Sequence, residues 1–314
     1  MKESTPTSST GLELTRATSK VQVSKYTGAE YEYDYKQVSY IGDESIAKYC
    51  SSLRQRFAQQ RQAPEAAEQW IARTYLATKY LLAASLMLSS ARFAIAQHLR
   101  IVEPYLLYYA LFNASRTLFL VIPEQPWNGG RLIGDPTHLK VQNVVHDCLG
   151  HLSIDAATRY KDVIRRALAT REMFSYRFPA QGLRGSFASI APELEEVTTV
   201  CQFLAELAQL HSECLESSFR SLPDVELPNA SQALKTLLLY EPRSLNSAVT
   251  DAEDWYRLWQ FARHSNKPLS LHLTARPGLV EDFFGAWSLD EDHNEGFDVY
   301  DADSQDWRII FDFS

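Results

Sequence analysis

Three polar side chains interrupt an otherwise apolar stretch of the chain, Glu103–Pro123. They are Tyr109, Asn113 and Arg116, and their spacing places all three on one side of a helix. A buried arginine or asparagine is costly unless it is hydrogen-bonded, so this polar stripe needs a protein partner, a water molecule or a ligand. The stripe therefore predicts either a binding site or a hydrogen-bond network that fixes the packing of two helices.

A second group of residues has the chemistry of metal ligands but not the spacing. His146, Cys148 and His151 lie close together in VVHDCLGHL, yet on a helix they would not share one face. The four cysteines form no C-x-x-C pair, which indicates buried free thiols. The chain also lacks a P-loop, a G-x-S-x-G and a G-x-G-x-x-G motif. We therefore expect neither a metal nor a cofactor.

Apolar periodicity and capping residues predict that most of the chain is helical. The predicted helices run from Asp43 to about Gln60, from Pro64 to Ile101, over Glu103–Pro123, from His138 to Leu152 after a Thr137 cap, over Asp155–Arg171, from Ser189 to Phe219, over Ser231–Tyr240 and over Asp251–Ser265. The Glu103–Pro123 helix is apolar almost all round, so we expect it in the middle of a bundle.

Alternating patterns near both ends of the chain predict strands. Tyrosines alternate with polar residues in Glu30–Val38, and leucines alternate in LSLHLTA at Leu269, Leu271 and Leu273. FDVY and WRIIFDF flank a turn-like DADSQD and suggest a hairpin. The predicted fold class is therefore α+β and mainly α: a helical bundle with a small antiparallel β-sheet from the N- and C-terminal segments.

The charge is unevenly distributed along the chain. The formal net charge is −8, but residues 92–184 contain twelve Lys and Arg against seven Asp and Glu. The acidic segment Glu281–Ser314 contains eleven Asp and Glu and a single base, Arg308. A basic centre favours an anionic partner, and the acidic segment either restrains that centre, contacts a protein partner, or only keeps the surface solvated. With no signal peptide and no long apolar run, we expect a cytoplasmic protein without membrane contact.

The motif YYALFNASRTLF, followed by T-H-L-K-V, resembles the helix pair of the HEPN superfamily. The matching residues are Tyr108, Tyr109, Ala110, Phe112, Asn113, Ala114, Arg116, Leu118, Thr137, His138 and Val141. Pro104–Leu118 also resembles the "PxLLYYxLxNxxRxL" helix of YaaC-like bacterial proteins, and Ile190–Glu196 resembles their "IPELEE" helix start with one extra alanine. The two resemblances cover about residues 80–220. With these resemblances, the chain divides into a HEPN/YaaC-like helical domain with an N-terminal strand over 23–220 and a mixed α/β region with an acidic tail over 221–314. The Ser- and Thr-rich residues 1–22 have little to bury, so we expect a flexible lead-in there.

Catalytic members of the HEPN superfamily cleave RNA without metal through an Arg-x4–6-His motif, and they build the site from two subunits. Three pairs here have that spacing, namely Arg92/His98, Arg131/His138 and Arg257/His264, although none has a polar residue after the arginine. Only Arg131/His138 lies in the matching part of the fold, so the resemblance implies these two as catalytic residues. Beside them, Tyr109, Asn113, Arg116 and Lys140 are the candidates for binding a phosphate or a nucleotide.

Two hypotheses follow from these residues. The first is a HEPN-type protein directed at RNA or a nucleotide, acting as a metal-independent ribonuclease of the bacterial defence or toxin type and as a homodimer. The second is a non-catalytic, YaaC-like binding or scaffold module in which Asn113, Arg116 and His138 form a structural network.

Overall fold

The computed structural model describes residues 20–63, 66–127, 136–180, 190–220, 251–288, 300–303 and 305–313. All regular secondary structure among these residues is helical. The elements are α1 (Ser24–Thr27), the 3-10 helix η1 (Val38–Tyr40), α2 (Asp43–Gln60), α3 (Ala66–Ala96), α4 (Glu103–Leu120), α6 (His138–Leu152), α7 (Ile154–Tyr176), α8 (Leu194–Arg220), α10 (Ala252–His264), α11 (Leu271–Thr274) and α12 (Pro277–Gly285). The expectation of a mainly helical bundle is confirmed.

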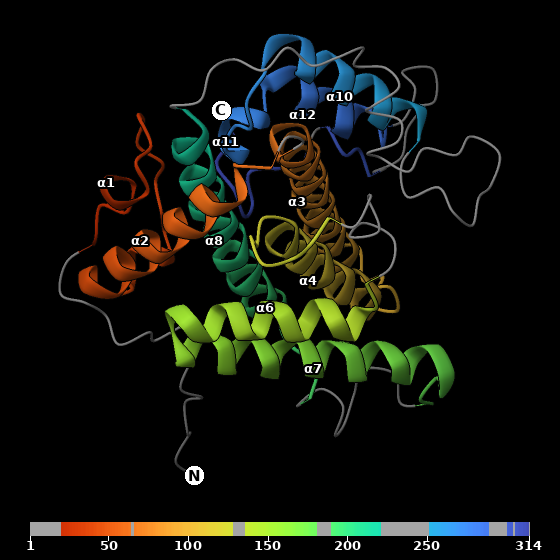
Figure 1. Cartoon of the computed structure of the whole chain (residues 1–314). Helices are drawn as coiled ribbons and strands as arrows, with labels where there is room; N and C mark the ends of the chain where they lie inside the picture. The colour runs from red at the N-terminus through yellow and green to blue at the C-terminus, as the bar shows by residue number, and fades with distance from the viewer. Residues whose placement is uncertain are drawn as a thin grey trace.

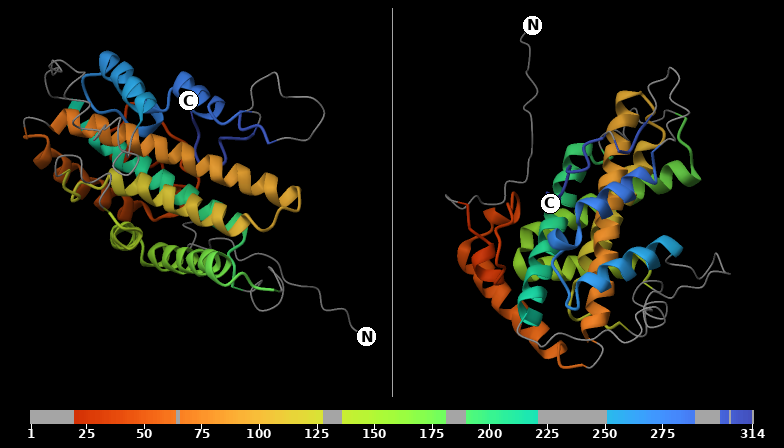
Figure 2. Two further views of the ribbon diagram at one scale, coloured as in Figure 1. Left: turned by 90° about the vertical axis from the view of Figure 1, so that its right-hand side faces the viewer. Right: turned by 90° about the horizontal axis from the view of Figure 1, so that it is seen from above.

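The centre of the molecule is the antiparallel pair α3 and α4, which α8 packs against (Figures 1 and 2). Both α3 and α4 bury residues on every side because they are apolar almost all round. Pro104 occupies the first turn of α4, where its missing N–H costs nothing. At the other end of α4, the buried side chain of Arg73 donates to three backbone carbonyls, those of Leu120, Ile122 and Gln125. This arginine satisfies carbonyl groups that the end of the helix leaves open.

Helices α6 and α7 form an antiparallel pair that lies across one face of the α3–α4 core (Figure 1). Thr137 caps α6 as its sequence position predicts, and its hydroxyl accepts the Lys140 N–H at 3.2 Å. Ser153 alone separates the two helices and caps α7 through the Ala156 N–H. Helix α4 contacts both α6 and α7, and its Tyr109 lies beside His138, the first residue of α6, and Arg171, in the second half of α7.

The C-terminal helices cover the other face of the core (Figures 1 and 2). Helices α10, α11 and α12 pack on α3, and α11 also contacts α8. Asp251 starts α10 with a reciprocal capping box formed with Asp254. The apolar side chains of this region belong to the same continuous core as those of α3, α4 and α8.

The predicted antiparallel sheet is wrong, because no strand occurs among the described residues at either end. At the N-terminal end, Tyr33 and Tyr35 are buried while Asp34 and Lys36 are exposed, so the period of two is real. The partner, however, is the α8 side chain of Glu206, whose carboxylate accepts the backbone N–H groups of residues 36–38 at 2.8–2.9 Å. A side chain thus satisfies the donors that a neighbouring strand would otherwise pair.

The predicted C-terminal strands are also absent. The alternating leucines of LSLHLTA form the single helical turn α11, and WRIIFDF consists of turns and bends. Phe297–Val299, the first part of the predicted hairpin, and the predicted helix Ser231–Tyr240 lie outside the described residues. Ile310, Phe311 and Phe313 are nonetheless buried, because their side chains join the common core without any backbone ladder.

A fully buried histidine links three helices in the core. His211 of α8 lies 3.2 Å from the Val121 carbonyl through Nδ1 and 2.7 Å from the Tyr49 hydroxyl through Nε2. The carbonyl can only accept, so Nδ1 carries the proton and Nε2 accepts from Tyr49. Burial lowers the pKa of His211 to about 3, so the ring is neutral at neutral pH.

We expect this histidine to make the protein sensitive to acid. Unfolding returns His211 to an ordinary pKa near 6.5, so the stability it contributes is complete above that value and is lost as the pH falls toward 3. Between pH 7 and pH 5 the loss is about 2 kcal/mol. His211→Gln, which keeps a donor and an acceptor, should lack this component when urea unfolding is compared at the two pH values.

The comparison of the two proteins is needed because other buried groups titrate in the same range. Burial raises the pKa of Glu206 and Glu213 to about 7, so these carboxyls make the protein more stable as the pH falls from 7 toward 4.5. Their effect is common to wild type and variant and cancels in the difference. Equal pH dependence of the two proteins would contradict the assignment to His211.

Among the described residues, no helix combines the length and the apolar content that crossing a bilayer requires.

Candidate functional site

The polar stripe of α4 lies where this helix meets α3, α6 and α7. Tyr109, Asn113 and Arg116 are each partly accessible, whereas most of their neighbours on α4 are buried. The guanidinium of Arg116 stacks on the ring of Tyr80 from α3, with 3.8 Å from its central carbon to the ring centroid. The stripe therefore faces an accessible junction of helices and is lined by aromatic rings.

His138 joins the stripe from the first position of α6. Its ring stacks on Phe112 with a centroid distance of 3.9 Å, and its Nδ1 lies 2.6 Å from the hydroxyl of Tyr108. The side chain of His138 is nonetheless exposed on its outer side. Two α4 aromatics thus orient an accessible imidazole, which leaves Nε2 available to another group.

Arg171 completes the cluster from α7. Its guanidinium carbon lies 4.9 Å from the centroid of Tyr108, and Nη1 donates to the hydroxyl of Tyr109 at 3.4 Å. Nη2 is 3.7 Å from the carboxylate of the neighbouring Glu172, while Nε is buried without a hydrogen-bond partner among the described residues. A buried donor without a protein partner costs free energy in the folded protein.

The two arginines make the cluster positively charged around the histidine. Burial, followed by the charges of Arg171 and Arg116, lowers the pKa of His138 below its ordinary value, so the imidazole is neutral at pH 7. Burial also lowers the pKa of the Arg116 guanidinium, which remains protonated at that pH. We name Arg116, His138 and Arg171 the cationic cluster; it offers two permanent charges and one neutral imidazole to an anion.

The structure brings together only some of the residues that the sequence suggested. Tyr109, Arg116 and His138 meet, whereas Arg131 lies outside the described residues. Lys140 is exposed two positions after His138, which places it on another side of α6. Asn113 is partly exposed, and no described residue forms a hydrogen bond with its side chain, although its backbone carbonyl accepts from Thr117.

The other residues with suggestive spacing are dispersed. His98 lies in the turn between α3 and α4 with a left-handed φ of 59°, and the nearby Arg92 pairs with Asp306 instead. Within α6, Cys148 is buried against Tyr49 at 3.3 Å while His151 is exposed. No group of three potential metal ligands gathers among the residues that the structure describes.

Sequence reasoning missed Arg171, Tyr108 and Tyr80 as members of the site. A signal for Arg171 exists, because it follows Ile164 by seven residues and Ala167 by four, both of which belong to the buried face of α7. A charged residue next to an apolar helix face is a candidate for a buried or ligand-binding role. The periodicity of α7 does not show which face of α4 Arg171 contacts, because that depends on how the two helices pack.

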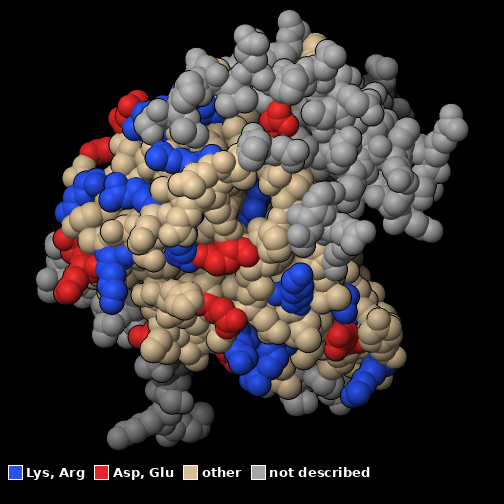
Figure 3. Space-filling view, in the orientation of Figure 1, with Lys and Arg blue, Asp and Glu red and all other residues tan. Residues whose placement is uncertain are grey.

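On the molecular face shown in Figure 3, Lys and Arg alternate with Asp and Glu over the region of α6 and α7. That face therefore has no continuous basic field, and attraction of an anion to the cationic cluster would be short in range.

Comparison with protein-family models, with curated proteins and with solved structures finds no match to this chain. The resemblance to the HEPN and YaaC-like proteins thus rests on its motif residues, and function is argued from the site itself.

Proposed function

We propose that the chain binds a phosphate group of RNA or of a nucleotide at the cationic cluster. The observation that supports this proposal is the placement of Arg116 and Arg171 near an accessible, neutral imidazole that Phe112 and Tyr108 hold in place. Guanidinium groups are the preferred protein ligands of phosphate. The proposal agrees with what the HEPN-like motif implies.

The binding prediction is tested with two arginine variants of α7. Arg171→Gln removes one phosphate contact, and we expect about tenfold weaker binding of a fluorescein-labelled single-stranded RNA in anisotropy titrations. The slope of log affinity against log salt should also fall by about 0.7, the value for one contact on a single strand. The matched control is Arg165→Gln, because Arg165 lies on the same helix with 78% of its side chain exposed, and its ion pair among the described residues is with Asp162.

Competition identifies which phosphate compound is preferred. Unlabelled ATP that displaces the RNA at lower concentration than an RNA trinucleotide would favour a nucleotide ligand, and the reverse order would favour RNA. Equal losses in the Arg171→Gln and Arg165→Gln variants would contradict the site and indicate only nonspecific charge attraction.

Metal-independent RNA cleavage is a second candidate, and the geometry of His138 favours it. In the tautomer whose Nδ1–H donates to the Tyr108 oxygen, the neutral ring presents Nε2 as a base for a 2′-hydroxyl proton. Arg116 and Arg171 would stabilise the charge that develops on the phosphorus oxygens. The resemblance implies a site built by a homodimer, so the molar mass of the purified protein in solution should be measured alongside cleavage to establish its oligomeric state.

Incubation with total RNA and tRNA in EDTA tests this second candidate. We expect the wild type to produce 2′,3′-cyclic phosphate ends and His138→Ala to produce none. Because His138 is exposed, the variant should keep its melting temperature within a few degrees. RNA binding without cleavage by either protein would restrict the function to binding. Absence of both, with a lower melting temperature of His138→Ala, would assign the cluster a structural role.

A further inference from the structure

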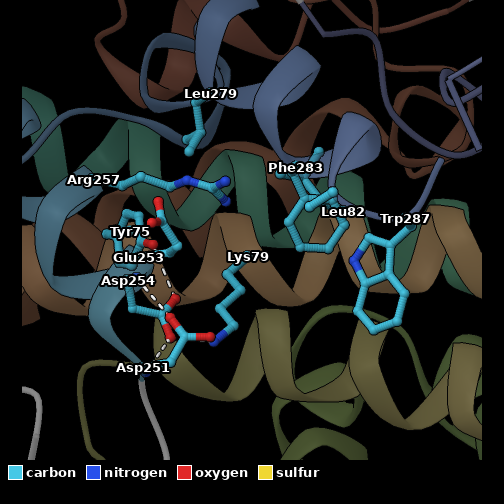
Figure 4. A pocket seen from close by; sticks show the side chains of 11 residues that line it. Tyr75, Lys79, Leu82, Asp251, Glu253, Asp254, Arg257, Leu279, Phe283 and Trp287 are labelled. Atoms are coloured by element: carbon cyan, nitrogen blue, oxygen red, sulfur yellow. Dashed lines mark hydrogen bonds and ion pairs between the residues drawn. The ribbon is translucent and has the colours of Figure 1, made fainter. Parts of the chain in front are cut away.

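A cavity of about 280 Å³ lies between α3, α10 and α12, apart from the cationic cluster. One wall is charged and the other is apolar (Figure 4). Lys79, Asp254 and Arg257 contribute to the charged wall, whereas Leu82, Phe283 and Trp287 form the apolar wall. This size is near the lower end of the range for small-molecule sites, which excludes a dinucleotide-sized ligand.

The inner part of the charged wall is already satisfied. Asp254 is 4% exposed, and its carboxylate accepts from the Tyr75 hydroxyl at 3.0 Å, from Lys79 Nζ at 2.5 Å and from the Asp251 N–H at 3.0 Å. These bonds neutralise Asp254 and leave Lys79 with donor capacity at the cavity surface, since its side chain is 26% exposed.

Two side chains of opposite charge at this wall, Arg257 and Glu253, retain most of their capacity to form hydrogen bonds and ion pairs with a ligand. The guanidinium of Arg257 extends over the cavity (Figure 4), and the one hydrogen bond it makes within the described part of the chain is long, 3.3 Å to the Asp282 carbonyl. Glu253 is exposed at the second position of α10 and forms no ion pair with another described residue. The cavity thus offers donors for a carboxylate and an acceptor for an ammonium group on the same wall.

The apolar wall is suited to a hydrocarbon or aromatic group. Phe283 is 9% exposed and Leu82 is 1% exposed, so both are fixed by the core, whereas Trp287 is 61% exposed at the edge of the cavity. An exposed tryptophan beside a cavity presents apolar surface that a ligand would cover.

We propose that this cavity binds a zwitterionic α-amino acid with an apolar side chain. The carboxylate of the ligand lies against Arg257 and Lys79, its ammonium group against Glu253, and its side chain between Phe283 and Trp287. Because Glu253 and Arg257 place opposite charges on the same wall, a zwitterion is the class of ligand that contacts both with complementary charge.

Three compounds with the same phenyl group test the proposal by isothermal titration calorimetry on the full chain. L-phenylalanine carries both charges, 3-phenylpropionate only the carboxylate, and 2-phenylethylamine only the ammonium. We expect L-phenylalanine to bind at least tenfold more tightly than either analogue. Quenching or a blue shift of tryptophan fluorescence that disappears in Trp287→Phe would place the ligand at this cavity.

Matched variants separate the two charge contacts. Arg257→Gln should abolish the preference for L-phenylalanine over 2-phenylethylamine, and Glu253→Gln should abolish its preference over 3-phenylpropionate. Glu281→Gln, a change of an exposed carboxylate on α12, should alter neither. Absence of saturable binding, equal affinity for the three compounds, or preferences unchanged in both variants would overturn the proposal. RNA binding by the same variants should be unchanged, because the cavity lies apart from the cationic cluster, so this test does not depend on the outcome for that cluster.

Discussion

Replacing Arg73 by methionine is expected to destabilise the protein by about 3–5 kcal/mol. Arg73 is 3% exposed, and its three guanidinium nitrogens donate to the carbonyls of Leu120, Ile122 and Gln125 at 2.6–2.9 Å. Burial lowers its pKa to about 9, with an opposing contribution from Glu124, so the group remains charged at neutral pH. Methionine fills a similar volume but leaves three carbonyls in a dry interior without donors.

Urea unfolding followed by circular dichroism measures this effect. The stability of Arg73→Lys should lie between those of the wild type and Arg73→Met. One ammonium group cannot reproduce the planar arrangement of donors, nor the stacking on Trp70, whose ring centroid lies 3.8 Å from the guanidinium carbon. Arg165→Gln, on the surface of α7, should change stability by no more than about 0.5 kcal/mol. A loss below about 1 kcal/mol in Arg73→Met would contradict the assigned role at the end of α4.

Phe313→Ala is expected to cost about 3–5 kcal/mol, although the residue lies one position from the end of the sequence. Phe313 is 2% exposed and packs beside Phe311 and Trp307, with ring centroids 5.2 and 6.3 Å away. Asp312→Ala is the matched control, since that carboxylate is exposed in the same segment. The melting temperatures of the two variants should differ by about 5 °C or more; near-equal melting temperatures would show that the segment does not support the core.

This anchoring affects how the acidic segment should be studied. Deleting Glu281–Ser314 would remove the second half of α12 and the buried aromatic residues together with the acids, so increased RNA binding of a truncated protein would not demonstrate restraint by charge. Replacing exposed acids such as Asp303 and Asp306 by asparagine alters the charge and leaves the apolar anchor in place. Of these two, Asp306 lies 3.9 Å from Arg92.

The helices could be predicted from the sequence because their signals are local. Asp43–Gln60 has the predicted bounds, and Thr137 caps α6 as its position before an apolar pattern indicates. The strands could not be predicted correctly, because an alternating pattern shows which side chains point inward but not what satisfies the backbone. At residues 36–38 that partner is the carboxylate of Glu206, some 170 positions further on.

The site was only partly predictable for the same reason. The spacing of Tyr109 and Arg116 on α4 and the resemblance of the Thr137–His138 helix start indicated that these residues meet. Arg171 comes from α7, and its role depends on how α7 packs against α4, which no local pattern specifies. The hydrophobic pattern accounts for the presence of each helix, whereas the cationic cluster is a product of their packing.

The contact between Glu206 and residues 36–38 also constrains the order of events on the ribosome. The residues at the start of the chain emerge first, but the carboxylate that holds their backbone follows about 170 residues later. At about 5–20 residues per second, the N-terminal segment waits roughly 10–30 s before its partner helix is synthesised. Throughout that interval Tyr33 and Tyr35 cannot reach their final packing, so the nascent chain exposes an aromatic segment to which a chaperone can bind.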